Sequence, residues 1–296
     1  MGTIQNRIFE SSCADMKELP DNSVDLIFTS PPYESRKKYD TPDGDLGRLR
    51  EGAFLDALKP ILSECQRVLK PTGSFFLNFQ GQYIDGRFTL TEAKLPVMAV
   101  EECGLGYVQN LYWTKTRPRP DNYNRRLKNR NELIYHFVKS IDDYVVHKDA
   151  VREPSRHRGH DSTCPLCNSL VKGKMDKRAW KYNPKGRDPG NVIFMKGATG
   201  QGTGDTWGGK SMGKARSNVH PALMPQGLAD FFVKYGSSEG QLVLDPFMGS
   251  GTTGIAAALL GRDYVGYELS PKYAEQARLR CQQAQEHWLQ SQRKAS

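Results

Sequence analysis

The stretch "LVLDPFMGSGTTGIAAALLGRDYVGYELS" (residues 242–270) has the pattern of a buried strand, a glycine-rich turn, a helix of small residues and a second strand that ends in an acid. Gly249 and Gly251 let the backbone turn tightly and approach a ligand at the helix N-terminus. Glu268 stands where nucleotide-binding folds place the acid that holds ribose hydroxyls. Further hydroxyls in the turn come from Ser250, Thr252 and Thr253. A capped helix would explain the glycines alone, but the whole pattern favours a ligand-binding loop.

The spacing of the loop limits the kind of ligand. A phosphate-binding P-loop needs a lysine directly after its second glycine, and Thr252 stands there instead. Gly254 completes the G-x-G-x-x-G spacing, so spacing alone leaves a dinucleotide open. Asp245 and Phe247 precede the glycines, and a carboxylate there would repel a pyrophosphate. The carboxylate of Asp245 would suit a ligand with a cationic sulfur or an α-amino group.

The rest of the chain alternates short apolar runs with helical patterns, which predicts a doubly wound α/β sheet. We expect further strands at 24–28, 74–79, 107–115 and 131–139, the last two able to pair with each other, and helices at 53–69, 220–236 and 271–290. A length of 296 residues suits one large α/β domain with an inserted module. No apolar run of membrane-spanning length and no signal-like N-terminus is present, so we expect a cytoplasmic protein with no membrane contact.

The positive charge lies in the middle of the chain. The net charge is +9, and residues 112–187 contain 19 Lys and Arg against 8 Asp and Glu. Such a cluster favours a polyanionic partner, because each phosphate contact releases counterions. Aromatic residues are interleaved with these charges, which favours nucleic acid over the alternative of a merely soluble surface.

A second unusual stretch is "FTSPPY" (residues 28–33), which ends the apolar run at 24–28. In a parallel sheet the carboxyl ends of the strands open on the ligand crevice, so this turn would lie beside the glycine-rich loop. Pro31 and Pro32 carry no N–H, and with the hydroxyl of Ser30 they make a rim rich in hydrogen-bond acceptors. The alternative is a proline-terminated edge strand against which Tyr33 packs.

These motifs together resemble a known family. "DPFMGSGTT" is similar to the cofactor motif of the DNA amino-methyltransferases, which use S-adenosylmethionine, and "TSPPY" is similar to their catalytic motif. The order of the two motifs resembles the circularly permuted β group of that family, and "RVLKPTGSFFLNF", "RNELIYHFVK" and "HPALMP" match as well. The resemblance implies a Rossmann-like, seven-stranded, mostly parallel sheet. It also implies a catalytic domain of residues 1–139 and 217–296 and an inserted basic target-recognition region of residues 140–216.

The resemblance implies the chemistry of the proline turn. The hydroxyl of Ser30 and the carbonyl of Pro31 would accept hydrogen bonds from an exocyclic amine and direct its attack on the sulfonium methyl. Tyr33 would stack on a base flipped out of the duplex. Serine in this motif is commoner in cytosine enzymes and aspartate in adenine enzymes, so 4-methylcytosine is favoured and 6-methyladenine stays open. A third alternative is a nucleic-acid-binding protein that holds the cofactor without turnover.

The remaining site residues come from the same resemblance or from the basic region. The expected cofactor-binding residues are Asp15, Thr29, His220, Asp245, Phe247, Gly249, Ser250, Gly251, Thr252, Thr253 and Glu268, where Asp15 and His220 can also be explained as caps. The expected DNA-binding residues are Arg152, Arg156, Arg158, Lys172, Lys174, Lys177 and Arg178. We expect double-stranded DNA as the partner, with a cognate restriction endonuclease as a further candidate, and a monomer or homodimer.

One motif suggests a metal. "HRGHDSTCPLC" brings together His157, His160, Cys164 and Cys167, and a Cys-Pro-x-Cys turn is a frequent zinc ligand pair. Only one such pair is present, so two reduced cysteines are the alternative. A zinc ion there would stabilise the recognition region and take no part in methyl transfer. The other cysteines, scattered along the chain, are expected to be reduced core residues.

Overall fold

The computed structural model describes residues 4–34, 46–116, 125–154, 183, 185–195 and 224–295. The strands of its main sheet are β1 (Arg7–Phe9), β2 (Val24–Thr29), β3 (Leu69–Phe79), β6 (Gly106–Lys115), β7 (Asn131–Val138), β8 (Val192–Met195), β9 (Leu242–Asp245) and β10 (Asp263–Tyr267). A separate hairpin is formed by β4 (Tyr83–Ile84) and β5 (Arg87–Phe88). The helices are α1 (Glu51–Val68), α2 (Thr91–Glu101), α4 (Gln226–Gly236), α5 (Thr252–Leu259) and α6 (Pro271–Ala295), with short 3-10 turns at Leu46–Arg48 and Lys148–Val151.

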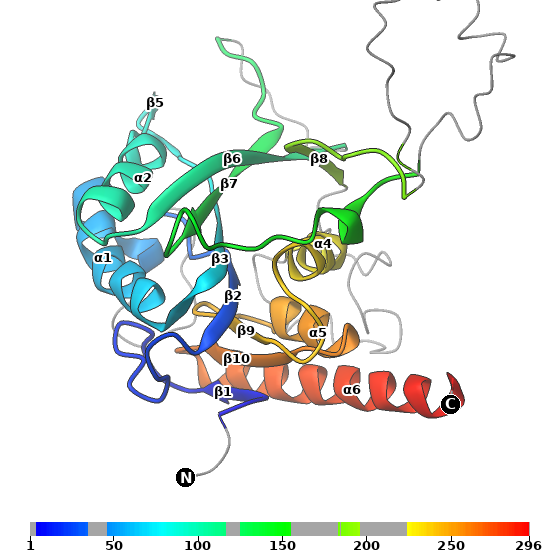
Figure 1. The fold of residues 1–296 in the computed structure, drawn as a ribbon. Helices are drawn as coiled ribbons and strands as arrows, with labels where there is room; N and C mark the ends of the chain where they lie inside the picture. Colours follow the sequence, from blue (N-terminus) through cyan, green and yellow to red (C-terminus); the bar gives the residue numbers. More distant parts are fainter. Residues whose placement is uncertain are drawn as a thin grey trace, which may run out of the picture.

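The main sheet has the order β1-β10-β9-β2-β3-β7-β6-β8 (Figure 1). In this order the first five strands, β1, β10, β9, β2 and β3, are parallel to one another. β7 is antiparallel to both β3 and β6, and β8 is parallel to β6. The expected mostly parallel α/β sheet and the expected pairing of 107–115 with 131–139 are confirmed. Because the parallel strands end on one side, their loops gather at one edge of the sheet.

Helices cover both faces of the sheet. Apolar side chains of α1 and α2 pack on one face, and those of α4, α5 and α6 pack on the other, so two hydrophobic cores form. The parallel strand β2 is buried along its whole length because it contributes side chains to both cores. This accounts for the apolar residues that flank Asp25 at 24–28, a run that alternation alone would not mark as a strand.

The expected count of seven strands is wrong for the described sheet, which has eight. Two short strands, β1 and β8, have no clear pattern in the sequence. β8 lies in the stretch where no regular structure was expected, and it extends the sheet because β6 offers it a free edge. Most of residues 140–216 lies outside the described residues, so the division into a catalytic domain and an inserted region stays a prediction.

The described cysteines agree with the expectation of reduced core residues. Cys13, Cys65, Cys103 and Cys281 are all buried and free. Burial raises the pKa of each of these thiols, so they stay protonated and unreactive at neutral pH. Among the described helices, none is long and apolar enough to cross a membrane.

Candidate active site

The glycine-rich loop and the proline turn meet at the carboxyl ends of two adjacent parallel strands. Thr29 is the last residue of β2 and Asp245 the last residue of β9, and these strands pair directly. The hydroxyl of Thr29 donates a buried hydrogen bond of 2.5 Å to Oδ1 of Asp245. The structure therefore joins the two motifs that the sequence separates by more than 200 residues.

The backbone of the glycine-rich loop is bent as its sequence predicts. Gly249 and Gly251 have φ angles of 53° and 88°, in the left-handed region, and α5 begins directly afterwards at Thr252. A side chain on Gly251 would also meet Cβ of Ala277 at 3.1 Å and Sγ of Cys281 at 3.2 Å. Glycine is required at this position both for its conformation and for the close packing of α6.

Glu268 holds the loop from the neighbouring strand. Its Oε2 accepts a hydrogen bond of 2.8 Å from the N–H of Gly249, and its Oε1 accepts one of 2.9 Å from the N–H of Ser270. The second strand of the motif thus reaches back to the first glycine. The role of Glu268 in holding ribose hydroxyls stays a prediction.

Asp245 is buried and Glu268 is half-buried, and the two acids lie close enough for their charges to interact. Burial raises the pKa of Asp245 to about 6, although hydrogen bonds from Thr29, Thr253 and the N–H of Phe247 act in the opposite direction. Burial also raises the pKa of Glu268, with backbone N–H groups opposing it and the charge of Asp245 adding to the rise. A cationic ligand would relieve both effects, because it stabilises the ionised carboxylates.

The proline turn is held by a buried polar network. The Tyr33 hydroxyl donates to Oε2 of Glu132 at 2.7 Å. The amide nitrogen of Asn78 donates to the same carboxylate oxygen at 3.0 Å and to the Tyr33 hydroxyl at 3.2 Å. Its contact with Ser30 Oγ is longer, at 3.4 Å, so the Ser30 hydroxyl can accept a stronger bond from a substrate. Pro31 is buried.

A lysine completes this network. Lys115, the last residue of β6, forms an ion pair with Oε1 of Glu132 and lies over the ring of Trp113, 5.0 Å from its centroid. Glu132 is only 5% exposed, so the cation and the two hydrogen-bond donors compensate its buried charge. Tyr33 is fixed at its hydroxyl by Glu132, and its half-buried ring meets the ring of Phe79 edge to face, with the two centroids 5.4 Å apart.

Three residues of this network, Asn78, Lys115 and Glu132, were not expected from the sequence. Each is a polar residue in or beside an otherwise apolar strand, in "SFFLNF", "YWTK" and "NELIYHFV". A buried polar group needs a hydrogen-bonding partner, so a lone polar residue in a buried strand is a usable signal. The sequence could have marked them as candidates, but not as partners of the proline turn.

The other expected cofactor residues that the structure describes differ in their exposure to solvent. Asp15 is exposed, two residues after Cys13, whose thiol is close enough to Asp245 and Glu268 for their charges to raise its pKa. Asp15 therefore lies on a segment that reaches the glycine-rich loop. Ser250, Thr252 and Thr253 are buried, and the Thr253 hydroxyl, which bonds Asp245, also lies 3.4 Å from the Phe28 carbonyl.

Most of the expected DNA and metal residues lie outside the described residues. This holds for His220 and for Arg156, Arg158, Lys172, Lys174, Lys177, Arg178, His157, His160, Cys164 and Cys167. Arg152 is described, and it bonds Oδ1 of Asp149 at 2.6 Å and the carbonyl of Gly186 at 3.1 Å. Within the described ranges there is no group of three or more His, Cys, Asp or Glu that could hold a metal.

Comparison with known proteins gives a family match and several relatives. A family model described as "DNA methylase" matches residues 24–279. The chain is 28% identical over 276 residues to the Type II methyltransferase M.BglII of Bacillus subtilis, covering 91% of this chain and 67% of that protein. It is 25% identical over 268 residues to the DNA adenine methyltransferase YhdJ of Escherichia coli (strain K12), covering 90% and 79%.

Solved structures share the fold. The PvuII DNA methyltransferase (cytosine-N4-specific) superposes with a TM-score of 0.66 at 20% identity, covering 96% of this chain and 92% of that one. A DNA modification methylase from Thermus thermophilus, complexed with S-adenosyl-L-methionine, superposes with a TM-score of 0.57 at 24% identity, covering 94% and 95%.

The raised pKa of Asp245 predicts a stability effect. In the folded protein this carboxyl keeps its proton up to a pH of about 6, well above the ordinary pKa of an aspartate. The folded state therefore binds the proton more tightly than the unfolded state, and the resulting stabilisation is fully present below about pH 4. That contribution is lost as the pH rises through 6. Asp245→Asn removes the titration, so the unfolding free energy of the variant relative to the native chain should grow by about 2 kcal/mol between pH 4.5 and pH 7. Urea unfolding of both proteins at the two pH values measures this, and an unchanged difference would contradict it.

Proposed function

The chain belongs to the family of DNA methylases, and from this premise we propose that it transfers a methyl group from S-adenosylmethionine to the exocyclic amine of cytosine within a short sequence of duplex DNA. The observation that carries the proposal is the hydrogen bond between Thr29 and Asp245. It fixes the acidic loop suited to a cationic ligand directly behind the acceptor-rich turn suited to an amine. Methyl donor and acceptor are thereby brought to one point.

The residues of the glycine-rich loop fit S-adenosylmethionine. The cofactor supplies a methyl group on a cationic sulfur. Asp245 and Glu268 are acids whose raised pKa values favour a positive ligand, and the backbone at Gly249 and Gly251 leaves no side chain between the loop and a ligand. Asp245 would face the methionine part, Phe247 the adenosine part and Glu268 the ribose hydroxyls. Asp15 would lie near the adenine edge.

The proline turn supplies the acceptors for the reacting amine. Hydrogen bonds to Ser30 Oγ and to the Pro31 carbonyl would draw the nitrogen lone pair out of conjugation with the base ring and point it at the methyl group. The nitrogen–carbon bond forms as the sulfur–carbon bond breaks, and the amine then releases one proton to solvent. No covalent enzyme intermediate is needed, because the amine itself is the nucleophile.

The choice of base rests on Ser30. Serine at this position favours cytosine, while the relatives of this chain include an adenine methyltransferase. The Ser30 hydroxyl is neutral and only weakly engaged, so it accepts a hydrogen bond without bringing a second charge close to Glu132. Adenine modified at its exocyclic amine is the second candidate, by the same mechanism.

Target recognition is assigned to the basic stretch. Residues 140–216 would contact phosphates and base edges of the duplex, and Tyr33 would stack on the flipped base. The likeness to Type II methyltransferases supports a role in restriction-modification beside a cognate endonuclease.

The product identifies the reaction. We expect the protein, incubated with S-adenosylmethionine and unmethylated genomic DNA, to yield 4-methylcytosine in nucleoside mass spectrometry. A 6-methyladenine product would keep the mechanism and overturn the base. Cofactor binding with no methylated base would favour a binding protein without turnover.

Removal of the acceptor should separate chemistry from binding. Ser30→Ala is expected to lower the methylation rate by about a hundredfold or more, because the amine loses a preorganised partner in the transition state. Its affinity for S-adenosylmethionine should be unchanged in calorimetry. Retained activity would sink the assignment of Ser30, and Ser63→Ala on the exposed side of α1 serves as the control.

Glu132 is expected to be a positioning residue. Glu132→Gln keeps an oxygen for the Tyr33 hydroxyl but turns an amide towards Lys115, so we expect kcat to fall about tenfold with unchanged cofactor affinity. Tyr33 and Glu132 act through the hydrogen bond between them. In a double-mutant cycle, Tyr33→Phe should therefore cause little further loss of kcat once Glu132→Gln is present. Fully additive losses would show that the two residues act separately. Glu101→Gln, exposed at the end of α2, is the control.

Cofactor affinity should depend on pH. A cationic ligand binds the ionised carboxylate of Asp245. Because the pKa of this group is about 6, half of the protein molecules carry the protonated, uncharged carboxyl at pH 6. The affinity for S-adenosylmethionine should therefore be about tenfold weaker at pH 5 than at pH 7. Titration calorimetry at both values tests this against Asp245→Asn, whose affinity should be weak at both. A flat profile in the native chain would contradict the role of Asp245.

A further inference from the structure

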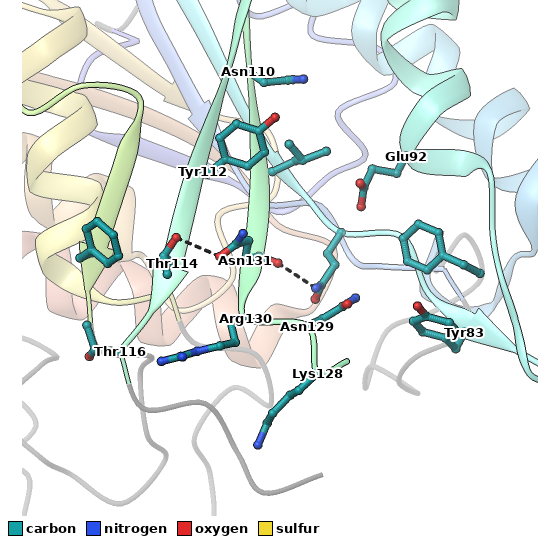
Figure 2. Close-up of a pocket in the computed structure, with 14 residues that line it drawn as sticks. Tyr83, Glu92, Asn110, Tyr112, Thr114, Thr116, Lys128, Asn129, Arg130 and Asn131 are labelled. Carbon is teal, nitrogen blue, oxygen red and sulfur yellow. Dashed lines mark hydrogen bonds between the residues drawn. The ribbon is translucent and has the colours of Figure 1, made fainter. Parts of the chain in front are cut away.

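A cavity of about 920 Å³ opens on the face of β6 and β7 opposite to the Glu132 network (Figure 2). Along β7, Asn131 lines the cavity and Glu132, the next residue, faces the proline turn. Successive side chains of a strand point to opposite faces, so one of these two adjacent residues faces the cavity and the other faces the proline turn. Gln80 lines the cavity two residues after Asn78, and its amide donates to the Asn131 carbonyl at 3.0 Å.

The walls of the cavity offer aromatic surface. Tyr112 and Phe194 lie on one side, and Tyr83 and Phe88 of the β4–β5 hairpin lie on the other. Phe194 is 69% exposed, a large fraction for a phenylalanine. Tyr83 packs on Phe88, and the Arg126 guanidinium lies 3.8 Å from the centroid of the Tyr83 ring. The rings of Tyr112 and Phe194 are therefore the ones suited to stack on a planar heterocycle.

The charged groups are arranged with the cations outside and an acid inside. Figure 2 shows Lys128 and Arg130 at the end of the cavity away from Asn110. In the part of the chain that the structure describes, the side chains of Lys128, Asn129 and Arg130 have no hydrogen-bond or ion-pair partner. Glu92 stands on the α2 side, where its Oε2 accepts the N–H of Gly81 at 2.9 Å.

This arrangement matches one nucleotide. Unpaired cations at the mouth suit a phosphate, which is held by charge, and rings suit the faces of a base. A carboxylate oxygen is the acceptor that an exocyclic amine of a base requires. Ser30 and Tyr33 do not line the cavity, so it is distinct from the site of the reacting base.

We propose that this cavity binds a second nucleotide of the DNA, next to the methylated one, and selects a base that carries an exocyclic amine. The proposal rests on the proposed DNA methylation. A strand whose reacting base lies at the proline turn continues past the ends of β3 and β7, where the cavity opens. The catalytic domain would then read part of the target sequence itself.

The test compares cavity variants with the native chain on DNA. The native protein first defines its target by sequencing of methylated DNA, and a library with randomised neighbouring positions is then methylated by Phe194→Ala and Asn129→Ala. We expect about a tenfold higher KM for DNA and a loss of base preference at one position beside the methylated base, with unchanged affinity for S-adenosylmethionine. Both residues are exposed, so the variants should fold, which their melting temperatures will verify.

Two controls make the result specific. Val192→Ala changes an exposed apolar residue of β8 that does not line the cavity, and it is the control for Phe194→Ala. Lys294→Ala removes one positive charge at the end of α6, and it is the control for Lys128→Ala, which removes an equal charge from the cavity. Neither control should alter KM or base preference. Cavity variants with native KM and native preference would overturn the proposal. A native protein that methylates no DNA would instead refute the proposed function.

Direct contact is read by cross-linking. DNA with 5-iodocytosine beside the methylated base should, on irradiation, attach to a peptide that contains Tyr112 or Phe194. Attachment confined to peptides from residues 140–216 would overturn the proposal.

Discussion

The hydrogen bond from the Thr29 hydroxyl to the buried carboxylate of Asp245 is the contact on which the site depends. It closes the gap between the last residues of β2 and β9, so a loop near the carboxyl end of the chain and a turn near its start share one crevice. Because the two strands are parallel neighbours, any shift in their register would move the glycine-rich loop away from the proline turn. The arrangement of the sheet is thus a condition of the chemistry as well as of stability.

The carboxylates of the site are buried or half-buried, and each has specific hydrogen-bonding partners. Asp245 accepts from the Thr29 hydroxyl and a backbone N–H, and Glu268 accepts from two backbone N–H groups. Glu132 is bonded by a lysine, a tyrosine and an amide. Buried carboxylates are unfavourable unless they are bonded in this way. The raised pKa of Asp245 shows that its compensation is incomplete, and a cation would complete it.

The strand β7 serves two sites through the alternation of its side chains. Glu132 holds the proline turn together with Asn78 of β3, while the adjacent Asn131 lines the cavity on the other side. Gln80, just past the end of β3, donates to the Asn131 carbonyl. Rigid strands are better than loops at keeping two such sites in a fixed relation. If the cavity receives a neighbouring nucleotide, the geometry of two strands sets the distance between the base that reacts and the base that is read.

The sequence by itself determined the α/β class, the glycine-rich loop, the proline turn and the pairing of 107–115 with 131–139, because periodicity, turn residues and motif order are local properties. It did not determine β1 and β8, which are too short for a pattern, or the network of Asn78, Lys115 and Glu132. Glu132 lies 99 residues from Tyr33 in the chain, and only the cross-strand register brings them together. The cavity is also a product of the tertiary structure, since its walls come from a hairpin, a helix and four strands of the main sheet or their ends. Local sequence specifies which groups are present; the packing of distant strands decides which of them meet.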